Sequence, residues 1–158
     1  MKSAANSLIA LGIMLAVSLS IPIFAQAETF GDWASQCEPA GQGKRCFLIQ
    51  TVKAGDRPIM VVVVAYSPNR DQVAAMIDVP LGMHIPTGLK INAAGAAKAL
   101  AFEQCLATGC RAILALDEAT IEALKAGGDA SITGRGRDGE KVQMPISSKG
   151  FKEAFETL

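Results

Sequence analysis

The sequence contains a single histidine, His84, and none of the local patterns that accompany catalysis by serine hydrolases or zinc proteases. Neither G-x-S-x-G nor H-E-x-x-H occurs, and no local pattern places a nucleophile beside the histidine. No run of carboxylates has the spacing of a calcium-binding loop. These absences predict a protein that is not an enzyme and uses no metal or other cofactor, with His84 in a surface loop.

Export is predicted by the first 27 residues. Lys2 precedes an apolar stretch over residues 8–24, and Ala25-Gln26-Ala27 has small residues at both positions that a signal peptidase reads. A retained transmembrane anchor is the alternative, because a stretch of this length can cross a bilayer. Pro22 and the cleavable triplet favour removal. We therefore expect a signal peptide over residues 1–27 and no integral membrane span after its cleavage.

The remaining residues, 28–158, have the size of one domain and contain no internal repeat and no Pro- or Ser-rich linker. They carry 15 acidic and 14 basic residues, a net charge of −1. A balance so close to neutral gives no electrostatic reason to expect nucleic acid or an anionic membrane surface as partner. We predict a single domain whose partner is a protein that composition does not identify.

Four cysteines lie in this part of the chain: Cys37, Cys46, Cys105 and Cys110. An even number in an exported protein predicts disulfides, and the spacings are not those of C-x-x-C redox or zinc sites. Four cysteines allow three pairings. Turn formers between Cys37 and Cys46, and a short Ala-Thr-Gly link inside the second pair, favour the two local bridges.

Short strands bounded by turn residues dominate the rest of the sequence. Residues 59–66 include four consecutive valines, which favour a strand, and their continuous apolar run indicates a central strand buried on both faces. Residues 93–99 are rich in alanine, but Asn92 and Gly95 favour a hairpin there. The other expected strands are residues 33–37, 46–52, 73–79, 89–92, 99–105, 111–116, 129–135 and 141–146. Eight or nine short strands predict an all-β sandwich or barrel.

Two short helices are also expected. Asp117 can cap the first, Leu116 and Ile121 occupy the two hydrophobic-staple positions, and Gly127-Gly128 can end it. In the second, Phe151, Ala154, Phe155 and Leu158 repeat with helical spacing after Ser148, a candidate cap. We expect this C-terminal helix to dock its two phenylalanines onto the core.

Gly134-Arg135-Gly136-Arg137-Asp138-Gly139 matches the G-x-G-x-x-G pattern of dinucleotide sites. That pattern requires a helix after it, whereas the following residues 140–145 favour a strand, and Asp138-Gly139 favours a hairpin turn. We therefore predict a β-turn that exposes Arg135 and Arg137. With His84, these arginines are our candidate partner-binding residues.

Six fragments occur in a familiar order after residue 30. They are Phe30-Gly31-Asp32-Trp33, Cys46-Phe47-Leu48-Ile49-Gln50, Asp78-Val79-Pro80-Leu81-Gly82, Phe102-Glu103-Gln104-Cys105, Gly109-Cys110-Arg111-Ala112 and Gly150-Phe151. Together with Cys37 they resemble the invasion-associated locus B family of exported proteobacterial proteins, over nearly all of residues 28–158. The resemblance implies an immunoglobulin-like β-sandwich and a periplasmic, outer-surface or secreted location. It brings no catalytic residues with it.

Three functional hypotheses follow. The first is a non-enzymatic envelope or secreted protein that contributes to host-cell association or invasion, using loops at residues 39–45, 83–88 and 134–140 on a rigid scaffold. The second is a periplasmic accessory protein that binds other envelope proteins along a long, unpaired sheet edge. The third is an enzyme whose site is assembled around His84, which requires that histidine in a pocket beside a carboxylate or hydroxyl. The sequence does not separate the first two.

Overall fold

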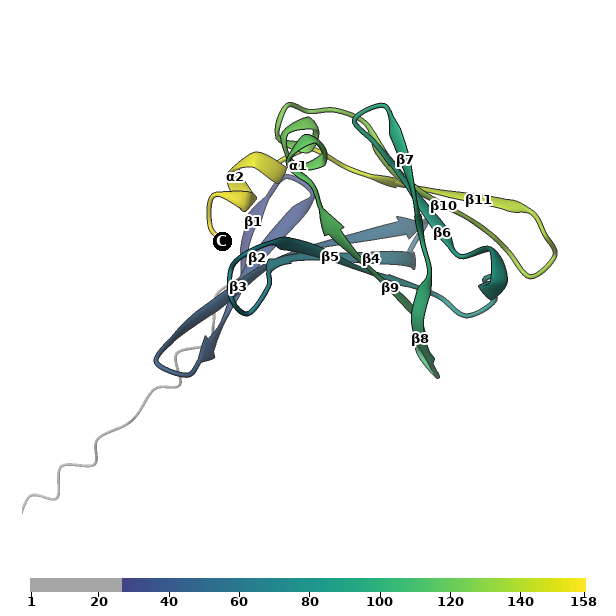
Figure 1. Cartoon of the computed structure of the whole chain (residues 1–158), viewed down its shortest axis with the longest axis horizontal. Coiled ribbons are helices and arrows are strands. Elements are labelled where there is room, and N and C mark those ends of the chain that lie inside the picture. The colour runs from purple at the N-terminus through teal and green to yellow at the C-terminus, as the bar shows by residue number, and fades with distance from the viewer. Residues whose placement is uncertain (1–26) are drawn as a thin grey trace, which may run out of the picture.

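The computed structural model describes residues 27–158, which form two antiparallel β-sheets and two short helices (Figure 1). The predicted all-β sandwich with one or two short helices is confirmed. The predicted signal peptide lies outside the described residues except for Ala27. Between residues 27 and 158, no helix is long and apolar enough to span a bilayer.

The larger sheet has seven strands, in the order β1-β2-β3-β4-β5-β9-β8. Their bounds are β1 Glu28–Phe30, β2 Trp33–Ala40, β3 Gly43–Ala54, β4 Arg57–Tyr66, β5 Val73–Val79, β9 Gly109–Leu116 and β8 Phe102–Leu106. The smaller sheet has four strands, in the order β11-β10-β6-β7. These are β11 Lys141–Ile146, β10 Ala130–Arg135, β6 Leu89–Ala93 and β7 Ala96–Leu100. A short 3-10 helix, η1 Ile85–Thr87, leads from the larger sheet into the smaller one.

Alternating apolar residues of both sheets form one core between them. On the larger sheet Leu48 and Ile77 are fully buried, and on the smaller sheet Ile132 is fully buried as well. Each side chain of this kind contributes roughly 1.5–3 kcal/mol when it leaves water. Burial of every second residue therefore fixes the register of the central strands and decides which side chains point outward.

Helix α2 (Phe151–Phe155) closes one end of the core against β1 and β2. Trp33 and Phe151 pack edge to face with ring centroids 5.1 Å apart, and both are almost completely buried. The indole Nε1 of Trp33 donates to the carbonyl of Ser147 at 2.7 Å. The predicted docking of the C-terminal phenylalanines is thus confirmed, with Phe155 partly buried against the same core.

The predicted cap of α2 at Ser148 is wrong. Gly150 occupies the cap position with a φ of +80°, and Ser148 contributes only its backbone carbonyl, which accepts from Phe151. A Cβ at Gly150 would lie 2.0 Å from the carbonyl oxygen of Phe30. Glycine is required here because the backbone conformation is left-handed and the two backbones nearly touch.

Helix α1 (Glu118–Lys125) has the predicted cap, since the Asp117 carboxylate accepts from the backbone N–H of Thr120 at 2.9 Å. Its end also agrees, with Gly127 at a φ of +84° after the last turn. The single strand expected over residues 99–105 is wrong: β7 ends at Leu100 in one sheet and β8 begins at Phe102 in the other. The three-residue β1 was not predicted.

Strand β4 is central, as predicted, but only one of its faces is fully buried. Val62 and Val64 point into the core, while Val61 and Val63 on the outer face stay half-buried. The expectation of two buried faces fails because the described residues place no second layer against the outer face of the larger sheet.

Candidate binding groove on the four-stranded sheet

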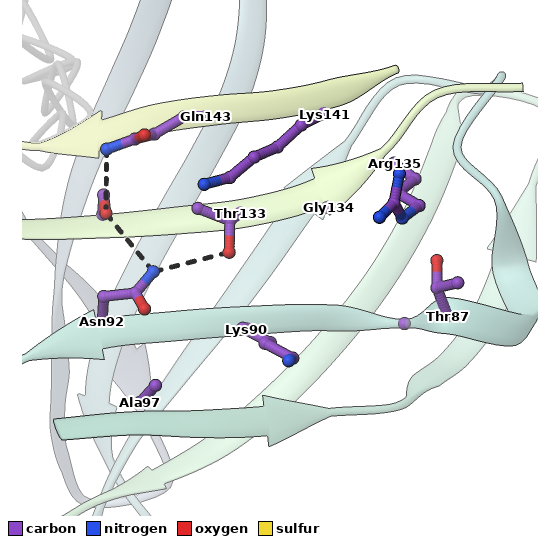
Figure 2. A pocket seen from close by; sticks show the side chains of 11 residues that line it. Thr87, Lys90, Asn92, Ala97, Thr133, Gly134, Arg135, Lys141 and Gln143 are labelled. Carbon is purple, nitrogen blue, oxygen red and sulfur yellow. Dashed lines mark hydrogen bonds between the residues drawn. The ribbon is translucent and has the colours of Figure 1, made fainter. Parts of the chain in front are cut away.

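The outer face of the smaller sheet carries a groove with a volume of about 690 Å³ (Figure 2). Strand alternation creates it. Residues 89, 91, 130, 132 and 144 point into the core, so their neighbours on β6, β10 and β11 point away from it. The outward residues are polar, and they form the floor of the groove.

Three cations converge on one end of the groove: Lys90 from β6, Arg135 from β10 and Lys141 from β11. Arg135 and Lys141 are direct cross-strand partners, and Lys90 is paired with Thr133, two residues before Arg135. Among the described residues that line the groove there is no carboxylate. This end therefore presents uncompensated positive charge to an approaching ligand.

These cations also stay outside the ion pairs found among residues 27–158. Those pairs are Lys98–Asp117, Arg111–Asp78 and Lys125–Glu122. Arg135 donates one guanidinium N–H to the carbonyl of Gly139 at 2.7 Å, which orients the side chain and leaves its other donors open.

Amide and hydroxyl groups occupy the middle of the groove. The amide of Asn92 lies 3.5 Å from the hydroxyl of Ser131 and 3.4 Å from that of Thr133, and the amide of Gln143 lies 3.5 Å from Ser131 (Figure 2). Hydrogen bonds this long are weak, so these groups can exchange them for shorter bonds to a ligand at little cost.

A second hollow, of about 550 Å³, continues the groove toward Pro145. The two share Asn92, Ala97, Ser131 and Gln143, and the second includes the carboxylate-bearing Asp129 at its far end. The combined groove is elongated and open, with its cations at one end, which fits an extended chain better than a compact ligand.

The structure places the three predicted partner-binding residues in different surroundings. Arg135 lines the groove, whereas Arg137 lies in the β10–β11 turn beside Leu81. His84 is exposed, its ring Nδ1 is 3.4 Å from the hydroxyl of Thr87, and its backbone N–H donates to the carbonyl of Arg135 at 2.8 Å. The groove thus gathers one of the three, with two lysines that sequence reasoning missed.

Strand alternation was the available signal for the missed residues. Lys90 follows the core residue Leu89, and Lys141 precedes Val142, which packs against the core, so alternation within the predicted strands places both lysines on the outer face. The strand order β11-β10-β6 cannot be read from the sequence, and this order brings two lysines that are 51 positions apart onto one surface.

Both predicted disulfides are present: Cys37–Cys46 joins β2 to β3, and Cys105–Cys110 joins β8 to β9. In each case the two cysteines are direct cross-strand partners near a hairpin turn. The described part of the chain contains no free cysteine and no cluster of His, Cys, Asp or Glu that could hold a metal ion.

Two ionisable groups outside the groove are perturbed. The hydrogen bond from Lys98, with those from Thr120, holds the pKa of Asp117 well below its usual range. The bidentate bond to Asp78, at 2.7 Å for each oxygen, raises the pKa of the Arg111 guanidinium. Both are structural ion pairs: the first ties β7 to the start of α1, and the second joins β5 to β9.

A small β-sandwich with a disulfide at each of two hairpins is the architecture of an extracytoplasmic domain, because such bonds persist only where the environment is oxidising. The chain belongs to the Invasion associated locus B (IalB) protein family, whose sequence pattern matches residues 33–158. The family resemblance expected from the fragments after residue 30 is confirmed.

Known relatives agree with this assignment. The chain is 27% identical over 157 residues to an invasion protein B homolog of Brucella abortus strain 2308, covering 94% of this chain and 89% of the relative. The homolog from Brucella abortus biovar 1 strain 9-941 gives the same values. The crystal structure of invasion associated protein B from Bartonella henselae superposes with a TM-score of 0.75 at 19% identity, covering 84% of this chain and 94% of that one. That likeness shows the shared fold.

Proposed function

We propose that this chain is exported and acts outside the cytoplasm as a non-enzymatic binding protein that contributes to host-cell association. The groove on the smaller sheet is its binding site, and its ligand is an acidic polysaccharide. The observation that carries the proposal is the convergence of Lys90, Arg135 and Lys141 above a floor of amides and hydroxyls. The Brucella relatives are named as invasion protein homologs, which supports the association with host cells.

The side chains of the groove fit an acidic polysaccharide in two ways. Lysine and arginine form charge-assisted hydrogen bonds with sulfate or carboxylate groups, and the Asn, Gln, Ser and Thr side chains both donate to and accept from sugar hydroxyls. The described lining residues include no aromatic ring. Stacking, which dominates the binding of single-stranded nucleic acids, therefore has no partner here.

The two other hypotheses receive less support. Each edge strand of the two sheets has three to six residues, β8 carries a bulge and a disulfide, and β11 includes Pro145, so none offers a long flat edge to another strand. Exposed His84 faces the hydroxyl of Thr87 and no carboxylate among its described partners, which is a poor arrangement for a general base.

Location is tested by adding protease to intact cells and measuring the mass of the untreated protein. We expect cleavage by added protease, a mass lacking residues 1–27, and four hydrogens fewer than the reduced chain. A protein protected until the outer membrane is opened would contradict host-cell association and favour a periplasmic role.

Ligand binding is tested separately with purified protein on immobilised heparin, as a representative sulfated polysaccharide. Replacing Lys90, Arg135 and Lys141 by glutamine should lower the affinity by about 10- to 1000-fold and weaken its dependence on salt. The matched control replaces Lys44, Lys53 and Arg57 by glutamine. These residues lie at the β2–β3 and β3–β4 turns, and their replacement removes the same amount of positive charge. Equal loss in both triple variants, or equal binding of wild type to duplex DNA, would contradict the proposed site.

A further inference from the structure

The outer face of the seven-stranded sheet has an apolar centre, and none of residues 27–158 forms a layer on it, which is unusual because the solvated face of an antiparallel sheet is normally polar. The strand register aligns one row of five residues directly across five adjacent strands. The row is Ala34, Ile49, Val63, Met76 and Ile113. Every member is partly exposed, and Ile113 keeps 38% of its surface in water.

Neighbouring positions of the same face extend this apolar row. On one side the register places Ala65, Ala74 and Ala115 in line, with Phe47 on β3 opposite Gln36. None of the large apolar residues Phe47, Ile49, Val63, Met76 and Ile113 belongs to the core or packs against it. We call this surface, centred on Val63, the valine face.

Polar residues with charges of both signs border the valine face. Beyond the apolar residues on the β5–β9 side lies the ion pair of Asp78 with Arg111. At the far end of β2 and β3 the register pairs Glu38 with Arg45. Glu103 on β8 also acts on Arg111, so acids and bases lie together at the β5–β9 margin. A surround with charges of both signs can be matched by a copy of the same surface.

The size of the face matches what a stable dimer requires. Five strands about 4.8 Å apart, each contributing about five residues of about 3.3 Å, span roughly 400 Å², with the apolar row in the middle and polar residues such as Gln36 and Thr51 at the edge. The whole sheet, with its polar surround, spans about 800 Å², which is the area that each partner contributes to an interface of standard size. An apolar centre with a polar margin is also the usual composition of such an interface.

We propose that two copies of this chain associate face to face through the valine face, with the same surface used on both copies. An apolar patch bordered by charges of both signs favours a second copy over a partner with charges of one sign, and two-fold symmetric dimers bury one patch against itself. The proposal does not depend on the ligand of the groove. It leaves the groove of each copy on the opposite side of its sandwich, so a dimer would present two grooves that face away from each other.

Sedimentation velocity of the chain with both disulfides formed tests the proposal at concentrations from about 1 to 100 µM, a range that brackets a micromolar dissociation constant. We expect a dimer in the upper part of the range. Val63→Glu should raise the dissociation constant by at least about 100-fold, because it places an unpaired carboxylate at the centre of the interface. The matched control is Thr133→Glu, a partly exposed outward position on the smaller sheet, which should leave the dimer unchanged.

A mixing experiment separates lost association from lost folding. Val63→Glu and Val63→Lys chains should each be monomeric with wild-type circular dichroism, and their equimolar mixture should sediment as a heterodimer. A wild type that stays monomeric throughout the range, or a mixture that stays monomeric, would overturn the proposal. The wild type could instead stay monomeric and co-sediment with phosphatidylcholine–phosphatidylglycerol vesicles, while Val63→Glu does not bind them. That result would assign the face to a lipid surface and would also overturn the proposed dimer.

Discussion

The two sheets of this sandwich share one core and differ in almost everything else. The seven-stranded sheet carries both disulfides, holds Trp33 against the C-terminal helix, and has an apolar outer face. The four-stranded sheet has no disulfide, and its outer face carries Lys90, Lys141 and a cluster of amides and hydroxyls. The larger sheet therefore provides the rigid support, and the smaller sheet presents groups that can exchange hydrogen bonds with a ligand.

This division has a physical basis. A binding face must keep its polar groups available, so it cannot also gain stability by burying them. The smaller sheet obtains its stability from its inner face, where Leu89 and Ile132 are buried because the larger sheet covers them. Substitutions should thus be costly on the inner face of the larger sheet and cheap on the groove side of the smaller one.

The largest effect should come from Trp33→Ala on the larger sheet. The substitution empties a fully buried site, ends the contact with Phe151 and removes the donor to Ser147, so we expect a loss of about 3–5 kcal/mol in the free energy of unfolding. Thr133→Ala on the groove side should change it by less than about 0.5 kcal/mol. Urea denaturation of both variants measures the contrast, and similar losses would mean that the two sheets are not divided as described.

A smaller effect is expected from removing the disulfide between β2 and β3. Replacing Cys37 and Cys46 by serine reopens a loop of nine residues and should cost about 2–3 kcal/mol by the loop-entropy model. The loss is measured by comparing the thermal unfolding midpoints of the wild type and the double serine variant, under both oxidising and non-oxidising conditions. An unchanged midpoint would show that this hairpin needs no covalent bond, while heparin binding should survive because the groove lies on the other sheet.

The smallest effect concerns the connection between the sheets. Asp117 caps α1 and forms an ion pair with Lys98 on β7. The hydrogen bond from Lys98 has the largest effect on the Asp117 carboxyl, and with the bonds from Thr120 it lowers the pKa of that carboxyl from an ordinary value of 3.8. A carboxyl whose pKa is lower in the folded protein stabilises it above the unfolded pKa, and that contribution is lost as the pH falls toward the folded pKa.

Asp117→Asn should therefore lower the unfolding midpoint at neutral pH and flatten its decline below about pH 4, where the wild type loses this contribution. Thermal unfolding at several pH values tests the prediction. Lys98→Ala serves as the comparison and should show a weaker version of the same change, because Thr120 still donates to the carboxylate. Parallel pH profiles of wild type and Asp117→Asn would contradict the role assigned to the cap.

Much of the fold could be predicted because its signals are local. The Cys37–Cys46 hairpin, the valine-rich β4 and the Asp117 cap each depend on a few neighbouring residues. The predictions were wrong where segments far apart in the sequence decide the local structure. Residues 99–105 read as one strand, but Leu100 and Phe102 belong to different sheets, and the cap of α2 is set by the approach of Gly150 to the backbone of Phe30.

The candidate site follows the same rule. Arg135 was identified because it lies in a recognisable glycine-rich turn, whereas Lys90 and Lys141 are ordinary outward residues of their strands. They become a site only when β10 pairs with both β6 and β11 and places them on one face.

The sequence by itself determined the all-β class and the family, and it favoured the two local disulfides that the structure contains, because alternation, turn residues and cysteine spacing act over a few positions. The signal peptide over residues 1–27 remains a prediction of that sequence. Only the tertiary structure decided which sheet each strand joins, that three cations meet on the smaller sheet, and that the outer valines of β4 face no other layer of the described chain. The physical reason is that strand pairing is non-local: burial fixes which side of a strand faces inward, but the order of strands decides what stands beside it.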